Sequence, residues 1–303
     1  MDRHTSKEKK GRASKDPRKK FPKPGGAEKP QTYPGLERTM VTRPDYGKES
    51  YAGSGKLVGK SALVTGGDSG IGRAVALAFA REGAHVMITY LPEEEKDAME
   101  ILADIQECGV KGIGVPGDLS DEAFCMELVQ GAQKELGHID ILVNNAALQK
   151  SFKSFEDIHA RDFVHSYQIN VIAPFLLSRA SAKHMRPGSS IINTVSIQAY
   201  APSAHLLPYA ASKGAFVALT KGLAEEFLNL GIRINAVAPG PIWSPLNTHG
   251  APVKKLKKFG EHSAFGRPGQ PVEVSPIYVF LASEDASYIH GEIYGVTGGE
   301  RIA

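Results

Sequence analysis

The sequence predicts an α/β fold in which a single doubly wound domain is built around a parallel sheet. From about residue 60 onward, short apolar runs with the character of strands alternate with longer stretches of helical periodicity. A glycine-rich turn joins the first such strand to the first such helix. The chain has 303 residues, of which 42% are hydrophobic. That is enough for one large core, so no second folded domain is needed.

Two segments precede this domain, which we place at residues 57–303. Residues 1–30 contain 11 Lys or Arg against 4 Asp or Glu and have almost no apolar content, so we expect a disordered basic tail. The net charge of the whole chain is +3, so its basicity belongs to this tail. No apolar stretch follows the charges, as it would in a secretory signal. Residues 31–56 carry large side chains among prolines, which predicts an extended arm packed on the domain or on a neighbour.

The first predicted strand, residues 61–64, leads directly into a glycine turn. The turn reads Thr65, Gly66, Gly67, Asp68, Ser69, Gly70, Ile71 and Gly72. Residues 71–82 follow with apolar side chains at helical spacing, so the turn lies at the amino end of a helix. N–H groups and the helix dipole at such an end favour a pyrophosphate, and glycines let it approach the backbone. The turn therefore predicts a dinucleotide site.

Later strand-like runs place further residues at the same edge of the sheet. The second strand ends near Tyr90, and the run 111–115 is followed by Asp118 and Leu119. Residues 139–143 lead into Asn144, Asn145, Ala146 and Ala147, and another run closes at Pro239 and Gly240, with Ile242 beyond it. In an open α/β sheet, ligands bind at the carboxyl ends of the strands. We therefore expect these residues to lie beside the dinucleotide.

A tyrosine and a lysine stand four residues apart in the predicted helix 209–230. They are Tyr209 and Lys213, and Ser196 lies 13 positions before the tyrosine. Residues at this spacing share one face of a helix. A lysine ammonium close to a phenol favours the phenolate and lowers a pKa that is otherwise about 10. Tyr209 is therefore a candidate for proton transfer near neutral pH.

In their order along the chain, these motifs resemble those of the short-chain dehydrogenase/reductase family, over about residues 57–303. The family pattern of TGxxxGIG, NNAG, Asn, Ser, YxxxK and PG is matched by residues 65–72, residues 144–147, Asn170, Ser196, Tyr209 with Lys213, and Pro239 with Gly240. Ala147 departs from the usual glycine and places one methyl group near the cofactor. The arm and the acidic run at 93–95 resemble a bacterial subgroup that includes general stress proteins and broad aldehyde reductases.

The resemblance implies a Rossmann-type fold, a homotetramer, and hydride transfer between NAD or NADP and a carbonyl/alcohol pair. Tyr209 would be the general acid/base, and Lys213 would hold the nicotinamide ribose and lower the pKa of Tyr209. Ser196 would hydrogen-bond the substrate oxygen, and Asn170 would anchor a water. The residues expected to hold the cofactor are Thr65, Gly66, Ser69, Gly70, Ile71, Gly72, Tyr90, Asp118, Leu119, Asn145, Ala146, Ala147, Tyr209, Lys213, Pro239, Gly240 and Ile242.

The choice between NAD and NADP depends on the end of the second strand. A carboxylate there favours the ribose 2′-hydroxyl of NAD, whereas Arg or Lys favours the 2′-phosphate of NADP. Residues 89–91 offer neither group. Asp68 in the glycine turn would repel a phosphate, and Arg73 could partly offset it. The sequence therefore leans toward NAD.

The substrate pocket is expected to follow the later strands, with a mobile lid over about residues 242–265. Its predicted lining is Gln149, Gln198, Tyr200, His205 and Trp243. This polar and aromatic set is nearly uncharged, which favours a small neutral carbonyl compound as substrate. The two cysteines, Cys108 and Cys125, are too few for a disulfide scaffold and lack metal-site spacing. We therefore expect a cytoplasmic protein without a metal.

Two other functions fit parts of the sequence. A non-catalytic dinucleotide-binding sensor or scaffold would keep the fold, but it would not need Asn170, Ser196, Tyr209 and Lys213 together. A nucleic-acid-associated protein would use the basic tail. We do not expect nucleic-acid binding, because a solubilising or flexible extension explains the tail more simply. No segment has the apolar length of a membrane span, so no membrane association is expected.

Overall fold

A seven-stranded parallel sheet forms the centre of the protein, in the order β3-β2-β1-β4-β5-β6-β7. The computed structural model describes residues 16–24, 28–249 and 253–302. Its strands are β1 (Ser61–Thr65), β2 (His85–Tyr90), β3 (Gly112–Pro116), β4 (Ile141–Asn144), β5 (Ser190–Thr194), β6 (Arg233–Pro239) and β7 (Ile293–Val296). The strand order reverses between β1 and β4, where doubly wound sheets bind their ligands.

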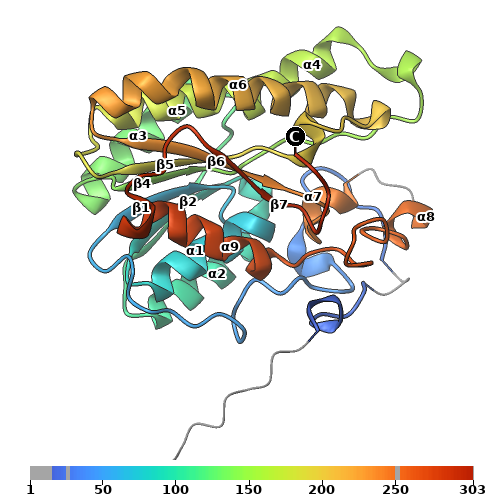
Figure 1. The fold of residues 1–303 in the computed structure, drawn as a ribbon, viewed down its shortest axis with the longest axis horizontal. Helices are drawn as coiled ribbons and strands as arrows, with labels where there is room; N and C mark the ends of the chain where they lie inside the picture. The colour runs from blue at the N-terminus through green and yellow to red at the C-terminus, as the bar shows by residue number, and fades with distance from the viewer. Residues whose placement is uncertain (1–15, 25–27, 250–252, 303) are drawn as a thin grey trace, which may run out of the picture.

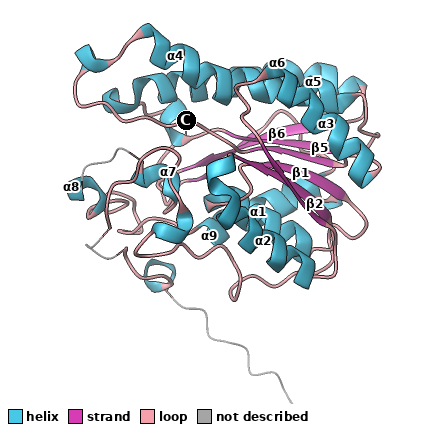
Figure 2. Ribbon diagram, turned by 180° about the vertical axis from the view of Figure 1, so that it is seen from behind, coloured by secondary structure: helices cyan, strands magenta, loops and turns pink. Residues whose placement is uncertain are grey.

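Helices cover both faces of this sheet, as Figures 1 and 2 show. Their bounds are α1 (Gly70–Arg81), α2 (Glu95–Glu107), α3 (Glu122–Leu136), α4 (Ala160–Tyr167), α5 (Ala173–Ala182), α6 (Leu207–Asn229), α7 (Pro245–Thr248), α8 (Val253–Leu256) and α9 (Pro271–Ala282). Helices α1, α2 and α9 lie on one face, and α3, α5 and α6 lie on the other. The predicted fold class, a doubly wound α/β domain, is confirmed.

The core is divided between the two faces of the sheet. In β1, Ala62 and Val64 belong to the cluster under α1 and α9, whereas Leu63 belongs to the cluster under α3 and α5. Successive strand residues point to opposite faces. All five residues of β1 are buried, because helices cover both sides of the strand. The continuous apolar runs seen in the sequence are therefore interior strands.

The elements that carry the motifs form where the sequence predicts them. The helix expected at 71–82 is α1, Gly70–Arg81, and the one expected at 209–230 is α6, Leu207–Asn229. The carboxyl-terminal strand is β7, beside β6. Within the described residues, no helix has the length and apolar character needed to cross a membrane.

The segments before the domain contact it closely. Of the predicted disordered tail, residues 1–15 and 25–27 lie outside the described residues. Arg267 donates a hydrogen bond to the Pro17 carbonyl at 2.7 Å, so ordered contacts begin before residue 31. Glu28 is buried and accepts hydrogen bonds from the backbone of Val41 and Thr42. The arm, drawn in blue in Figure 1, therefore packs on its own domain.

Candidate active site

A cavity of about 390 Å³ opens at the carboxyl ends of the strands. Most of the residues expected to hold a cofactor line it, namely Gly66, Ser69, Gly70, Ile71, Tyr90, Asp118, Leu119, Asn145, Ala146, Ala147, Tyr209, Lys213, Pro239, Gly240 and Ile242. Thr65 and Gly72 belong to the same turn but lie behind its surface. Residues from motifs that are far apart in the sequence therefore line one cavity.

The glycine turn is held against the end of β4 by reciprocal hydrogen bonds. The Thr65 hydroxyl accepts from the N–H groups of Asn145 and Ala146, at 2.9 and 3.0 Å. The Asn145 amide donates in return to the carbonyls of Thr65 and Gly66, at 3.0 and 3.1 Å. A Cβ atom on Gly72 would lie 1.8 Å from the Gly66 carbonyl oxygen, so only glycine fits there. Thr65 and Gly72 therefore shape the turn from behind.

Ser196, Tyr209 and Lys213 meet in this cavity. Tyr209 and Lys213 lie on α6, and Ser196 follows β5, close enough to Tyr209 to affect its pKa. The Lys213 ammonium lies 5.6 Å from the centre of the Tyr209 ring and donates to the Thr194 carbonyl at 2.7 Å. The three side chains therefore line the same part of the cavity.

Burial dominates the acid-base properties of this group. It raises the pKa of Tyr209 to about 12, although the hydrogen bond with Ser196 acts in the opposite direction. It lowers the pKa of Lys213 to about 7, because the ammonium is removed from water. The expectation that Lys213 lowers the pKa of Tyr209 is not met in this structure.

Asn170 braces the site without lining the cavity. It is fully buried in a π-helical turn, Gln168–Ile172. Its side-chain amide donates to the Leu148 carbonyl and to the Ser212 hydroxyl, both at 2.9 Å, and its oxygen accepts from the Leu148 N–H at 2.8 Å. Asn170 thus ties the segment after β4 to α6, one residue before Lys213. Its expected role as a water anchor stays a prediction.

The substrate end of the cavity contains three of the five predicted residues, Gln149, Gln198 and His205. The placement of the other two is wrong. Trp243 is completely buried, and its indole N–H donates to the Thr42 carbonyl at 2.8 Å. Tyr200 packs on the small apolar cluster around Phe216. Trp243 faces the arm instead of the substrate because the arm covers the segment after β6, which no local pattern reveals.

Two carboxyl groups face the other end of the cavity, beside the glycine turn and the end of β2. Asp68 is 2% exposed, and its Oδ2 atom has no hydrogen-bond partner among the described residues. Burial raises the pKa of Asp68 to about 6, and burial together with the Asp68 charge raises that of Glu94 to about 8. Carboxyl groups that line a cavity can accept hydrogen bonds from the hydroxyl groups of a ligand. With the adjoining glycine turn, this end fits the ribose and phosphates of a dinucleotide.

Sequence reasoning missed the contribution of the arm to this site. Tyr33, Pro34 and Gly35 line the cavity. The Tyr33 ring lies 5.4 Å from that of His249, and the backbone of Gln31 pairs with the residues after α7. A Cβ atom on Gly35 would lie 2.7 Å from the Pro245 carbonyl oxygen. These partners are more than 200 positions apart in the sequence, so the spacing of motifs could not predict their contacts.

Comparisons with known proteins agree with this geometry. A family model described as Enoyl-(Acyl carrier protein) reductase matches residues 66–300. General stress protein 39 of Bacillus subtilis is 44% identical over 93% of this chain and 98% of its own. NADPH-dependent aldehyde reductase 1, chloroplastic, of Arabidopsis thaliana is 44% identical over 90% of this chain and 96% of its own. A short chain dehydrogenase from Burkholderia cenocepacia J2315 in complex with NADP is 32% identical with a TM-score of 0.75, covering 80% of this chain and 98% of that one.

Proposed function

Because the chain belongs to the short-chain dehydrogenase/reductase family and is an oxidoreductase, we propose that it transfers hydride between a nicotinamide dinucleotide and a carbonyl/alcohol pair. Its catalytic residues are Ser196, Tyr209 and Lys213, and Asn170 is a positioning residue. The observation that carries this proposal is the meeting of these three side chains in one cavity, with Ser196 close enough to Tyr209 to affect its pKa.

The roles of these side chains follow from their chemistry. The bound nicotinamide supplies the hydride in reduction and accepts it in oxidation. In reduction, Tyr209 gives its proton to the substrate oxygen, while the Ser196 hydroxyl donates a hydrogen bond to that oxygen as charge develops. The resulting phenolate is stabilised by the Lys213 ammonium. With a pKa of about 7, Lys213 is acidic enough to return a proton to Tyr209.

For the cofactor, we propose NAD in preference to NADP. Asp68 and Glu94 would face the adenosine ribose, where carboxylates accept hydrogen bonds from hydroxyls and repel a 2′-phosphate. Lys213 is the single lysine or arginine lining the cavity in the described part of the chain, and it belongs to the catalytic end. The Burkholderia structure contains NADP, and the Arabidopsis relative is named for NADPH, so our proposal differs from the cofactors of these two proteins. The two carboxyl groups, Asp68 and Glu94, support the proposal of NAD.

For the substrate, we propose a small neutral aldehyde or ketone that carries hydroxyl groups. Gln149, Gln198 and His205 line the pocket, with Asn247 and His249 beside them. Amide and imidazole groups both donate and accept hydrogen bonds, as hydroxyl groups require. No lysine or arginine other than Lys213 lines the described cavity, so a carboxylate or phosphate on the substrate would have no dedicated partner.

A substrate panel tests this proposal. Simple aldehydes, hydroxyaldehydes, charged keto acids and an enoyl thioester are compared at saturating NADH and NADPH, by following the absorbance of the reduced nicotinamide. We expect the hydroxyaldehydes to give the highest kcat/KM. Faster turnover of the enoyl thioester would exclude the proposed substrate class. An absence of cofactor oxidation with every carbonyl compound would count against hydride transfer itself.

A further inference from the structure

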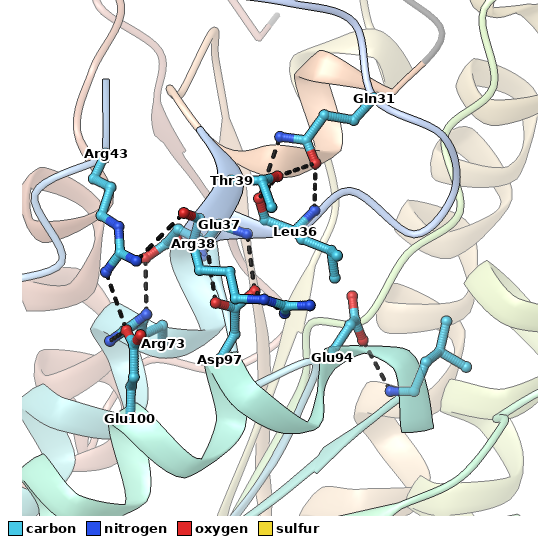
Figure 3. Close-up of polar contacts among 12 residues, drawn as sticks. Gln31, Leu36, Glu37, Arg38, Thr39, Arg43, Arg73, Glu94, Asp97 and Glu100 are labelled. Carbon is cyan, nitrogen blue, oxygen red and sulfur yellow. Dashed lines mark hydrogen bonds and ion pairs between the residues drawn. The ribbon is translucent and has the colours of Figure 1, made fainter. Parts of the chain in front are cut away.

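Glu37 of the arm reaches the phosphate-binding turn from outside the cavity. It is 1% exposed, and one carboxylate oxygen accepts the Gly70 N–H at 2.7 Å while the other accepts from Arg73 at 3.1 Å. Gly70 begins α1 and lines the cavity, whereas Glu37 lies outside the cavity wall. Figure 3 shows Glu37 in the cluster of polar contacts that joins the arm to α1 and α2.

The arm is fixed on both sides of this carboxylate. Asp97, in the first turn of α2, accepts the N–H groups of Glu37 and Arg38 at 2.9 and 3.0 Å. The Gln31 side chain accepts the Leu36 N–H at 2.6 Å and donates to the Leu36 carbonyl at 3.2 Å, as Figure 3 shows. Glu37 is therefore held in place by α2 and by the arm itself, independently of any ligand in the cavity.

Arg73 balances the charge of Glu37. Its guanidinium is buried, lies 4.0 Å from the centre of the Tyr46 ring, and also contacts Glu100 at 3.2 Å. Burial raises the pKa of Glu37 to about 7, although the Arg73 charge and the Gly70 N–H both oppose this shift. Because arginine keeps its proton in proteins, Arg73 favours the ionised form of Glu37, which accepts from both donors.

Gly70 needs such a partner. Its φ of +53° lies in the left-handed region, and glycine is the most flexible residue in the unconstrained chain. We propose that Glu37 is a positioning residue for the dinucleotide: it fixes Gly70, so that the cofactor binds a turn that already has its bound shape. This inference rests on the proposed cofactor site. Preorganisation of this kind increases affinity without a new contact to the ligand.

The substitution Glu37→Gln tests it, because glutamine has the same shape but only one acceptor oxygen. Its oxygen can replace only one of the two carboxylate oxygens, so its NH2 group must face either the Gly70 N–H or Arg73, and both of these are donors. The matched control is Glu100→Gln, which faces the same arginine from a half-exposed position away from the turn. NADH affinity is measured by fluorescence titration, alongside kcat at saturating cofactor and the melting temperature. We expect Glu37→Gln to raise the NADH Kd about tenfold and to leave kcat within about twofold, with Glu100→Gln unchanged.

Other results would overturn the inference. An NADH Kd for Glu37→Gln equal to or tighter than wild type, with a lower melting temperature, would make Glu37 a structural residue only. A loss confined to kcat would also contradict it. If wild-type protein bound no dinucleotide, the proposed function itself would fail.

Hydrogen exchange provides a measurement that does not need the variant to fold. In wild-type protein without cofactor, the Gly70 amide should be strongly protected, because it donates to a buried carboxylate. Exchange at the rate of an unstructured amide would refute the assignment.

Discussion

Replacing Lys213 by methionine should stabilise the protein and abolish its activity. Lys213 is 1% exposed, and burial lowers its pKa from 10.5 to about 7. Between these two values the unfolded chain holds a proton that the folded protein lacks, so wild-type stability rises with pH. From pH 7 to pH 9.5, the titration of Lys213 should raise the free energy of unfolding by about 3 kcal/mol. Methionine is similar in length and does not titrate, so the variant should lack this rise.

Urea unfolding of cofactor-free wild type and Lys213→Met at pH 7, 8 and 9.5 measures the effect. The variant should be more stable at pH 7, by roughly 2 kcal/mol after allowing for the unpaired Thr194 carbonyl, and its advantage should disappear toward pH 9.5. Lys221→Met, at an exposed position on the same helix, controls for the loss of a lysine. If the free energies of unfolding of wild type and Lys213→Met differed by the same amount at all three pH values, the reasoning would be refuted.

Further predictions concern the catalytic serine, the cofactor preference and the assembly. Ser196→Ala should lower kcat about 10²-fold, the lower end of what the loss of such a donor costs, and less than Tyr209→Phe, because the proton donor remains; steady-state assays of the two variants test this order. The ratio of kcat/KM for NADPH to that for NADH should fall between pH 6 and pH 9, since Asp68 and Glu94, with raised pKa values, lose protons in that range; a constant ratio would exclude these carboxyl groups. We also predict a homotetramer; light scattering at micromolar concentration that gave a monomer mass would contradict this.

The parts of the site that could be predicted depend on local patterns. Tyr209 and Lys213 share a helix face because they are four residues apart, and the glycine turn is defined by the strand before it and the helix after it. The carboxyl ends of parallel strands lie at one edge, so Asn145 and Gly240 line the same cavity as the turn although they are far from it in sequence. The alternation of strands and helices is therefore sufficient to predict which residues lie at this edge of the sheet.

The parts that could not be predicted depend on contacts between distant segments. Trp243 lies outside the cavity because its indole N–H contacts the Thr42 carbonyl, and Glu37 contacts Gly70, which is 33 positions away in the sequence. The pKa of Tyr209 also depends on contacts between distant segments. Sequence spacing places Lys213 nearby, but the burial of both groups by the surrounding elements determines the direction of the shift.

The most direct test of the proposed mechanism is the turnover of Tyr209→Phe. This change removes only the phenolic oxygen, so the fold and NADH affinity should be retained while proton transfer to the substrate is lost. General acids typically contribute about 10²- to 10⁴-fold, and kcat should fall by that amount with little change in melting temperature. If folded Tyr209→Phe protein binds NADH normally and reduces an aldehyde at the wild-type rate, Tyr209 is not the acid and the mechanism is wrong.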